Sequence, residues 1–179
     1  AFEDMARLAM KSRDTEGAAV VLEEAVGRPG IGPDLRVRLA GLYADYNMPD
    51  KALALLEEAV SADLTPRNAE SIFRAYLTGV RLAKERRDQA AIDRFLRSLE
   101  GRDGALAELH DYVFDLDAVR TFSIAGRGRS ALACLKRAVE AGYSRLEWIE
   151  SDAEMESLRK EAGFAALLRS RRPAVPPND

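Results

Sequence analysis

The sequence predicts an all-α protein in which helix pairs follow one another along the chain. Its 179 residues are 47% apolar and 32% charged, which suits one globular domain or one repeat array. Ala, Leu, Glu and Arg are abundant and no convincing run of alternating β-branched residues occurs, which favours helices over strands. The motif "LEEAV" occurs at Leu22–Val26 and again at Leu56–Val60, and this spacing of 34 residues indicates a repeated unit.

The same period recurs at positions with a structural role. Ala18 and Leu22 return one period later as Ala52 and Leu56, and spacings of three and four place such residues on one helical face. The small Ala side chains let the second helix of each pair approach the first closely. The adjacent glutamates of the two motifs diverge by about 100° along a helix and are expected to face solvent.

Turn and cap residues place the helices of the second and third repeats. Asn47 tolerates a left-handed backbone conformation, and Pro49 suits the first position of the next helix. A longer helix is predicted over about Arg67–Lys84. Asp88 is the expected N-cap of its partner helix, and Gly101 is the expected stop.

A fourth repeat is predicted around the turn at Ala125–Ser130, where Gly126 supplies conformational freedom. Phe122 precedes this turn, and Ala131 and Leu135 follow it with helical spacing. The four repeats are expected at about residues 1–32, 33–66, 67–101 and 104–142.

The end of the chain, residues 143–172, is predicted to form capping helices. A short helix should start at Ser151-Asp152, and Gly163 should separate it from the last helix. Residues 173–179, "PAVPPND", are too proline-rich for a helix and are interpreted as a linker or frayed end. The apolar residues expected to fold over the last repeat are Tyr143, Leu146, Trp148, Met155, Leu158, Phe164 and Leu167.

These residues resemble the tetratricopeptide repeat (TPR) family. Counted from Pro33, the second repeat carries the family's small and aromatic positions at Ala40 and Tyr43. Its second helix carries the Ala, large apolar and Ala positions at Ala52, Leu56 and Ala59. The stretch 131–170 resembles the extension that ends bacterial TPR arrays. The resemblance implies a right-handed α-solenoid of about four helix pairs with a C-terminal helical cap, belonging to a larger bacterial protein.

The resemblance further implies a non-catalytic scaffold that binds a peptide or helix of a partner protein. In this family the first helix of each repeat lines a concave groove. Lys11, Arg81 and Lys84 are expected to flank that groove and to engage carboxylates, which indicates an acidic partner. Packing between helices or exposure to solvent is the alternative for each residue. The full set of groove candidates is Arg7, Met10, Lys11, Val37, Gly41, Tyr76, Val80, Arg81, Lys84, Leu116 and Arg120.

An enzyme would have to be built from very few groups. His110 is the only histidine, and a proton-transfer or metal role for it is the enzymatic alternative. Cys134 is the only cysteine and is expected to be a buried, inert thiol. No metal-ligand spacing, dinucleotide fingerprint or phosphate loop is present. The sequence therefore predicts no catalytic residue, no metal and no cofactor, and leaves open a regulatory domain attached to an enzyme.

Nucleic-acid binding is the remaining alternative. Residues 67–102 hold 9 basic and 5 acidic side chains, but the whole chain has a net charge of −3, which argues against a phosphate-driven footprint. No stretch is apolar for long enough to span a bilayer, and the start resembles no signal peptide. We expect a cytoplasmic piece of a longer protein, with self-association left open because no polar helix precedes Phe2–Lys11.

Overall fold

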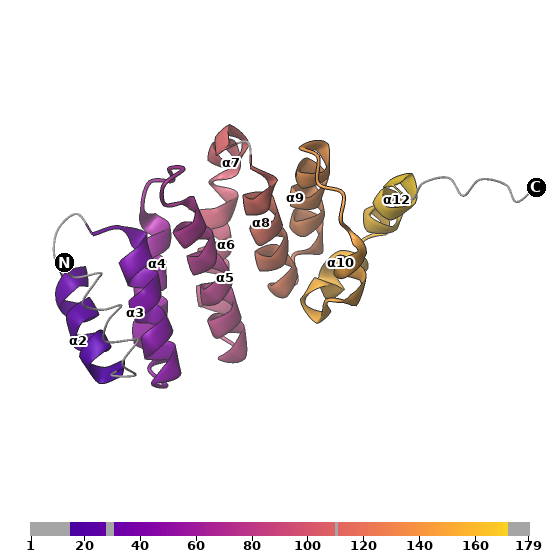
Figure 1. Cartoon of the computed structure of the whole chain (residues 1–179). Helices are drawn as coiled ribbons and strands as arrows, with labels where there is room; N and C mark the ends of the chain where they lie inside the picture. The colour runs from indigo at the N-terminus through magenta and orange to yellow at the C-terminus, as the bar shows by residue number, and fades with distance from the viewer. Residues whose placement is uncertain (1–14, 28–30, 110, 172–179) are drawn as a thin grey trace, which may run out of the picture. The chain divides into compact units, whose positions relative to one another are not determined.

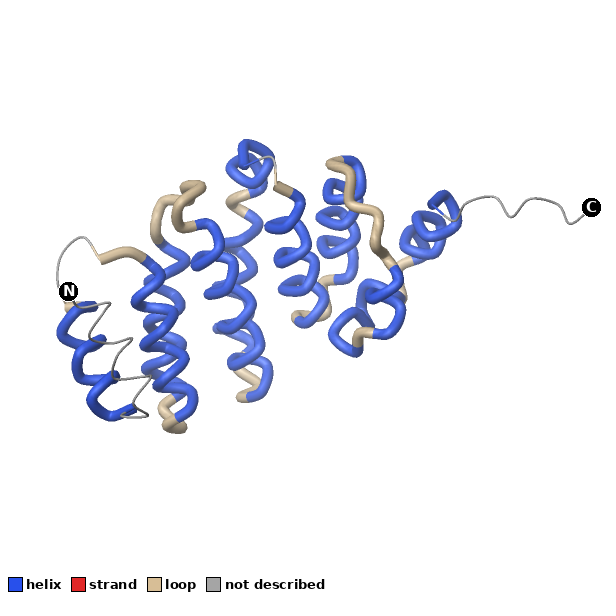
Figure 2. Tube along the Cα trace, in the orientation of Figure 1, coloured by secondary structure: helices blue, strands red, loops and turns tan. Residues whose placement is uncertain are grey.

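The computed structural model describes residues 15–27, 31–109 and 111–171 (Figure 1). All regular secondary structure in these ranges is helical, as predicted, and none of it is strand (Figure 2). The chain divides into two compact units, Ala1–Leu109 (unit 1) and His110–Asp179 (unit 2). The predicted boundary between residues 142 and 143 therefore lies inside unit 2.

The described helices of unit 1 follow one another along the chain, and each of the first five packs on its neighbour in sequence. Contacts also join helices that are two apart, α3 with α5 and α4 with α6. Each inner helix is therefore covered by more than one neighbour, and its apolar residues are buried between the helices. The helices are α2 (Thr15–Val26), α3 (Pro33–Asp45), α4 (Pro49–Ser61), α5 (Ala69–Glu85), α6 (Gln89–Glu100) and α7 (Asp103–Leu109).

The predicted caps of unit 1 are confirmed. The Asp88 side chain accepts a hydrogen bond from the backbone N–H of Ala91 at 2.9 Å and caps α6, whose C-cap is Gly101. Pro49 occupies the first turn of α4. Helix α5 begins two residues later than predicted, at Ala69, and ends one residue later, at Glu85.

The same turn closes the first helix of three successive pairs. After α3, the N–H of Met48 bonds to the carbonyl of Tyr43 at 2.7 Å, with Asn47 between them at a φ of 58°. This is the Schellman arrangement, which needs one residue in the left-handed region. Arg87, with a φ of 58°, and Gly126, with a φ of 78°, occupy the equivalent place after α5 and after α8 (Tyr112–Ile124).

The two "LEEAV" motifs supply the core, as predicted. Leu22 and Leu56 are 0% exposed, and so are the alanines that follow them. Of their glutamates, Glu23, Glu24 and Glu58 are exposed, as predicted, and Glu57 is half-buried. Glu23 accepts a hydrogen bond from the Tyr43 hydroxyl on α3, and Glu57 pairs with Arg94 of α6 at 2.7 Å. Both motifs thus also join neighbouring helices by polar contacts.

A glycine and an arginine hold α5 and α6 in place. A Cβ added to Gly79 would lie 2.4 Å from the Phe95 ring, so the two helices can approach this closely only at a glycine. The Arg102 guanidinium donates to the Tyr76 hydroxyl at 2.8 Å and to the carbonyl of Ala62 at 2.7 Å, just past the end of α4. Arg102 thereby links α5 to the C-terminus of α4.

Unit 2 combines a helix pair with the predicted capping segment. Helices α8 and α9 pack on each other, η1 and α11 cover α8, and α11 and α12 cover α9. Leu146, Met155, Leu158 and Phe164 are buried in this packing, as predicted. The elements are α8 (Tyr112–Ile124), α9 (Gly128–Glu140), α10 (Glu147–Ser151), η1 (Ala153–Met155), α11 (Glu156–Arg159) and α12 (Ala162–Arg171).

The start of the last helix differs from the prediction. Asp152 does begin a short helix, because its side chain accepts from the backbone N–H of Glu154 at 2.9 Å. Gly163, however, lies in the first turn of α12 and does not separate the helices. A Cβ at Gly163 would lie 2.7 Å from Leu132 Cδ2, so this glycine serves close packing of α12 on α9.

Candidate protein-interaction surface

The predicted groove residues fall into three groups. Arg7, Met10 and Lys11 lie outside the described residues. Val37 is only 9% exposed, and Tyr76 and Val80 are 0% exposed. The third group keeps accessible surface: Gly41, Arg81, Lys84, Leu116 and Arg120.

Tyr76 and Val80 belong to the core of unit 1 and not to a surface that a partner can reach. Helix α5 is covered by α3, α4 and α6, so its apolar face has no side left for a ligand. The Tyr76 hydroxyl is also engaged, by Ser98 Oγ at 2.8 Å and by Arg102. Val37 of α3 is buried in the same way.

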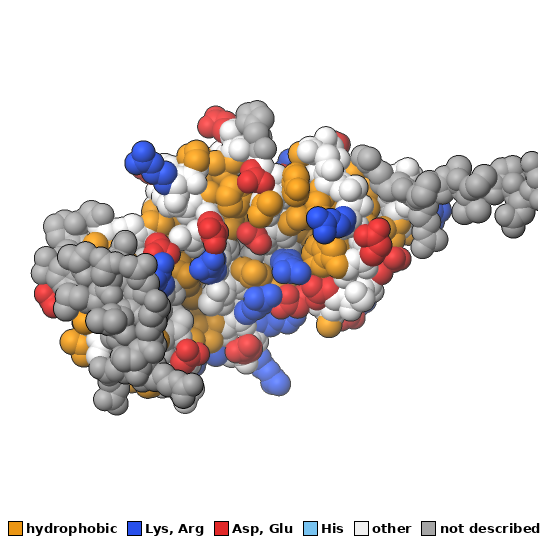
Figure 3. Space-filling view, in the orientation of Figure 1, with side chains coloured by type: hydrophobic (Ala, Val, Ile, Leu, Met, Phe, Trp, Pro, Cys, Tyr) orange, Lys and Arg blue, Asp and Glu red, His pale blue; other side chains and the backbone are white. Residues whose placement is uncertain are grey.

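The basic residues of 67–102 do not form a patch of one sign. Arg86 pairs with Asp50 at 2.8 Å, and Arg94 pairs with Glu57, whose hydrogen bond raises the pKa of Arg94 further. Both pairs connect to α4. The face drawn in Figure 3 correspondingly shows basic and acidic side chains intermixed. This arrangement gives no support to a phosphate-binding surface.

Unit 2 does expose large apolar side chains, at the start of α8. Tyr112 is 39% exposed and Val113 is 47% exposed. Val113, Leu116 and Arg120 share one face of α8 because they are three and four residues apart. Tyr143 and Trp148, both half-buried, lie beside this helix. We call these six residues, Tyr112, Val113, Leu116, Arg120, Tyr143 and Trp148, the aromatic surface.

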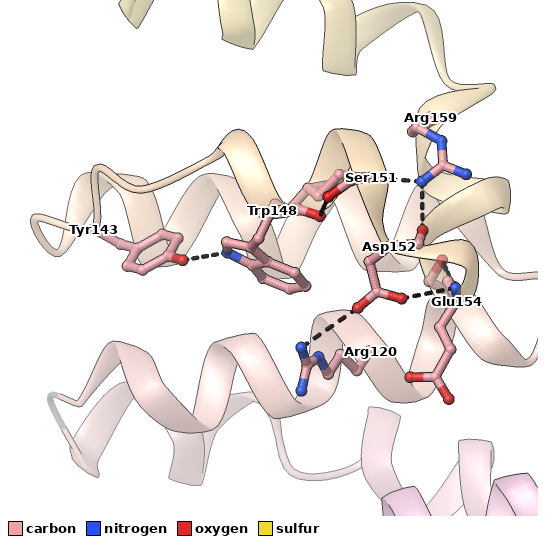
Figure 4. A network of polar contacts seen from close by, with 9 residues as sticks. Arg120, Tyr143, Trp148, Ser151, Asp152, Glu154 and Arg159 are labelled. Carbon is pink, nitrogen blue, oxygen red and sulfur yellow. Dashed lines mark hydrogen bonds and ion pairs between the residues drawn. The ribbon is translucent and has the colours of Figure 1, made fainter.

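The aromatic rings contact one another in series. The centroids of Tyr112 and Tyr143 are 5.5 Å apart with the rings tilted by 39°, which is favourable aromatic geometry. Trp148 Nε1 donates a hydrogen bond to the Tyr143 hydroxyl (Figure 4). Tyr112 of α8, Tyr143 before α10 and Trp148 within α10 thus form three linked rings.

Arg120 contacts Trp148, the last of these three rings. Its guanidinium lies over the Trp148 ring, with Cζ 4.7 Å from the centroid, and Nη2 is 3.4 Å from Asp152 Oδ2 (Figure 4). Asp152 is itself held as the cap of η1. The Arg120 Nε is buried and has no hydrogen-bond partner among the described residues. Arg120 was predicted to line a groove, and the contact that the structure shows for it is with Trp148 and Asp152.

A cleft of about 400 Å³ opens beside these rings. Trp, Tyr and Arg are the residues most enriched among those that dominate binding energy at protein interfaces. The lining of the cleft contains these three residue types. Its lining residues are Tyr112, Gly142, Tyr143, Ser144, Arg145 and Trp148.

Sequence reasoning found part of this surface. Leu116 and Arg120 were predicted as groove residues, and Tyr143 and Trp148 as capping residues. Tyr112 and Val113 were missed. The sequence does place both on an apolar helical face. They begin a helix whose next apolar positions, Leu116 and Val119, follow at helical spacing.

Groups for catalysis are scarce in the described part of the chain. His110 lies outside it. Cys134 is 2% exposed, which confirms the predicted buried thiol. No group of three or more His, Cys, Asp or Glu able to hold a metal ion occurs among the described residues. Within the same residues, no helix is long and apolar enough to cross a membrane.

Comparisons of the chain with protein-family models, with curated proteins and with solved structures give no match. The contacts of the described residues are therefore the basis on which a function is assigned. Among them, the aromatic surface combines exposed apolar area, an open cleft and a fixed arginine.

Proposed function

We propose that this chain is a non-catalytic protein-interaction module that binds a peptide or helix of a partner protein. We further propose that it is a TPR-like, right-handed α-solenoid of about four helix pairs with a C-terminal cap, within a larger bacterial protein. Sequential packing and the Schellman turns at Asn47, Arg87 and Gly126 support a repeated helix-turn-helix unit.

The observation that carries the binding function is the exposure of the aromatic surface. Monomeric proteins rarely leave contiguous large apolar side chains in water without a use for them. In unit 2, Tyr112 and Val113 stay exposed next to the cleft, although Ala118 and Val119 further along α8 are buried. We assign the partner's contact to this surface, with Leu116 and Arg120 as its continuation along α8.

Selection from a random peptide library displayed on phage tests this function. The full chain should enrich peptides that bind to it in solution. Val113→Asp should weaken their binding at least about tenfold, because it places a charge in the apolar contact, about 1.4 kcal/mol. Val20→Asp is the matched control, since Val20 is 64% exposed on α2 of unit 1, and it should leave binding unchanged.

Failure to enrich any peptide would contradict the proposal. Enriched peptides that bind equally well to the Val113→Asp chain would contradict the assigned surface. Circular dichroism of both variants shows whether each keeps its helices, which separates lost contact from lost folding.

A further inference from the structure

We propose that the cleft of the aromatic surface docks the chain's own proline-rich segment, residues 173–179, in an extended conformation. This inference rests on the proposed function, because it names one ligand for the surface assigned above. It joins two features of the chain: the open cleft beside Tyr112 and the sequence "PAVPPND".

The cleft has an aromatic wall and open space in front of it. The tilted rings of Tyr112 and Tyr143 provide adjacent apolar faces. Gly142 lies next to them with a φ of +105°, and a Cβ built on it would meet no atom within 4 Å. A ligand can therefore approach the backbone at Gly142 while it contacts both rings.

The polar groups that line the cleft are hydrogen-bond donors. The hydroxyls of Tyr112 and Ser144 and the guanidinium of Arg145 can all donate. The Tyr143 oxygen already accepts from Trp148, so its own hydrogen is left for a ligand. Arg145 forms no ion pair with another described residue, and none of the described lining residues carries a carboxylate. Such a lining suits a ligand rich in acceptors and poor in N–H groups.

Residues 173–179 have this chemistry. Pro173, Pro176 and Pro177 lack an N–H, and each leaves a carbonyl that only accepts. Proline also fixes φ, which favours the extended polyproline II conformation that aromatic-lined grooves bind at low entropic cost. Asp179 adds a negative charge that complements Arg145.

The segment is within the same unit as the cleft. Helix α12 ends at Arg171, and the eight residues after it span roughly 25 Å at about 3.1 Å per residue in polyproline II. Docking in the same copy and docking in a second copy are distinguished by the experiment below.

A fluorescence titration tests the proposal, because Trp148 is the only tryptophan and lines the cleft. The acceptor is the full chain with Pro173→Ser, Pro176→Ser and Pro177→Ser, so that its own segment does not compete. A synthetic peptide with the natural sequence of residues 172–179 should change the Trp148 emission saturably. The same peptide with its three prolines replaced by serine keeps its charges and should bind at least about tenfold more weakly.

Two variants locate the contact. Tyr112→Ala, made in the acceptor chain, should weaken peptide binding at least about tenfold. Tyr46→Ala removes a tyrosine of nearly equal exposure, 38% against 39%, from unit 1 and should have no effect. If Tyr112→Ala loses its helical signal, calorimetry with Tyr112→Phe replaces it: loss of the hydroxyl alone should reduce affinity measurably.

The native chain completes the test. Its Trp148 emission should differ from that of the triple-serine chain. A difference independent of protein concentration indicates docking in the same copy, and one that grows with dimer formation indicates a second copy; both support the proposal. Equal emission at all concentrations overturns it, as does equal binding of the serine peptide.

If library peptides bind and the segment does not, this inference fails alone; if neither binds, the proposed function fails with it.

Discussion

Unit 1 buries the aromatic side chains of α5 and α6 completely, whereas unit 2 holds three linked aromatic rings at or near its surface. Phe73, Tyr76 and Phe95 are 0% exposed, while Tyr112 is 39% exposed and Trp148 is half-buried. One arginine of each unit shows the same difference between buried packing and exposed contact. Arg102 donates to the carbonyl of Ala62, just past the end of α4, and Arg120 stacks on Trp148 at the edge of an open cleft. Residues of the same types thus hold the helices together in one unit and form a contact surface in the other.

The strongest test of this difference removes one buried and one surface aromatic. Phe95→Ala should lower the free energy of unfolding of unit 1 by about 3–5 kcal/mol, because it leaves a cavity under Gly79. Trp148→Ala should cost unit 2 clearly less, since Trp148 keeps exposed surface. Urea unfolding followed by circular dichroism measures both. Equal losses would show that Trp148 is a core residue.

The tyrosine hydroxyls sharpen the comparison. Tyr76→Phe should destabilise unit 1 by about 1–2 kcal/mol, because Arg102 Nε and Ser98 Oγ lose a buried partner. Tyr112→Phe, at the surface of unit 2, should change stability by less than about 0.5 kcal/mol. A Tyr76→Phe chain that is as stable as the native one would contradict the linking role given to Arg102.

The third prediction concerns pH. Burial, together with the hydrogen bond to Glu23, raises the pKa of Tyr43 to about 12, from about 10 in the unfolded chain. The folded protein keeps a proton that the unfolded chain releases. This stabilisation is fully present below pH 10 and is lost as the pH rises through 12, with roughly 1 kcal/mol gone by pH 11. The loss between pH 9 and 11 should be smaller by that amount in Tyr43→Phe.

The smallest effects are expected at the left-handed turn residues. Arg87→Gly should stabilise unit 1 by about 0.5 kcal/mol, because a φ of 58° strains a residue with a Cβ. Gly126→Ala should destabilise unit 2 by about 1 kcal/mol for the same reason. Gly41→Ala is the control: Gly41 lies within α3 with space for a Cβ, so alanine should stabilise it. Thermal unfolding resolves these shifts.

The helices and most of their ends could be predicted, because their signals are local. Asn47, Pro49, Asp88 and Gly126 have strong conformational preferences and lie where predicted. Arg87 shows the limit: nothing in an arginine favours the left-handed region, and the turn between α5 and α6 imposes it.

The candidate site was only partly predictable. Tyr76 and Tyr112 each lie on the first helix of a pair, and helical periodicity places both on an apolar face. Periodicity does not show how many neighbours cover that face. Helix α5 has neighbours on both sides, whereas the start of α8 within unit 2 does not bury its tyrosine. The exposure of Tyr112 therefore follows from packing and not from a local sequence signal.

The guanidinium of Arg102 has a consequence for the order of folding. It bonds to the carbonyls of Val60 and Ala62, which lie 42 and 40 residues earlier in the chain. Most helix contacts in this unit join near neighbours in sequence and close quickly, whereas such a distant bond requires both partners to be in place. The Arg102 bonds should thus form after the transition state, so that removing them accelerates unfolding and leaves the folding rate almost unchanged.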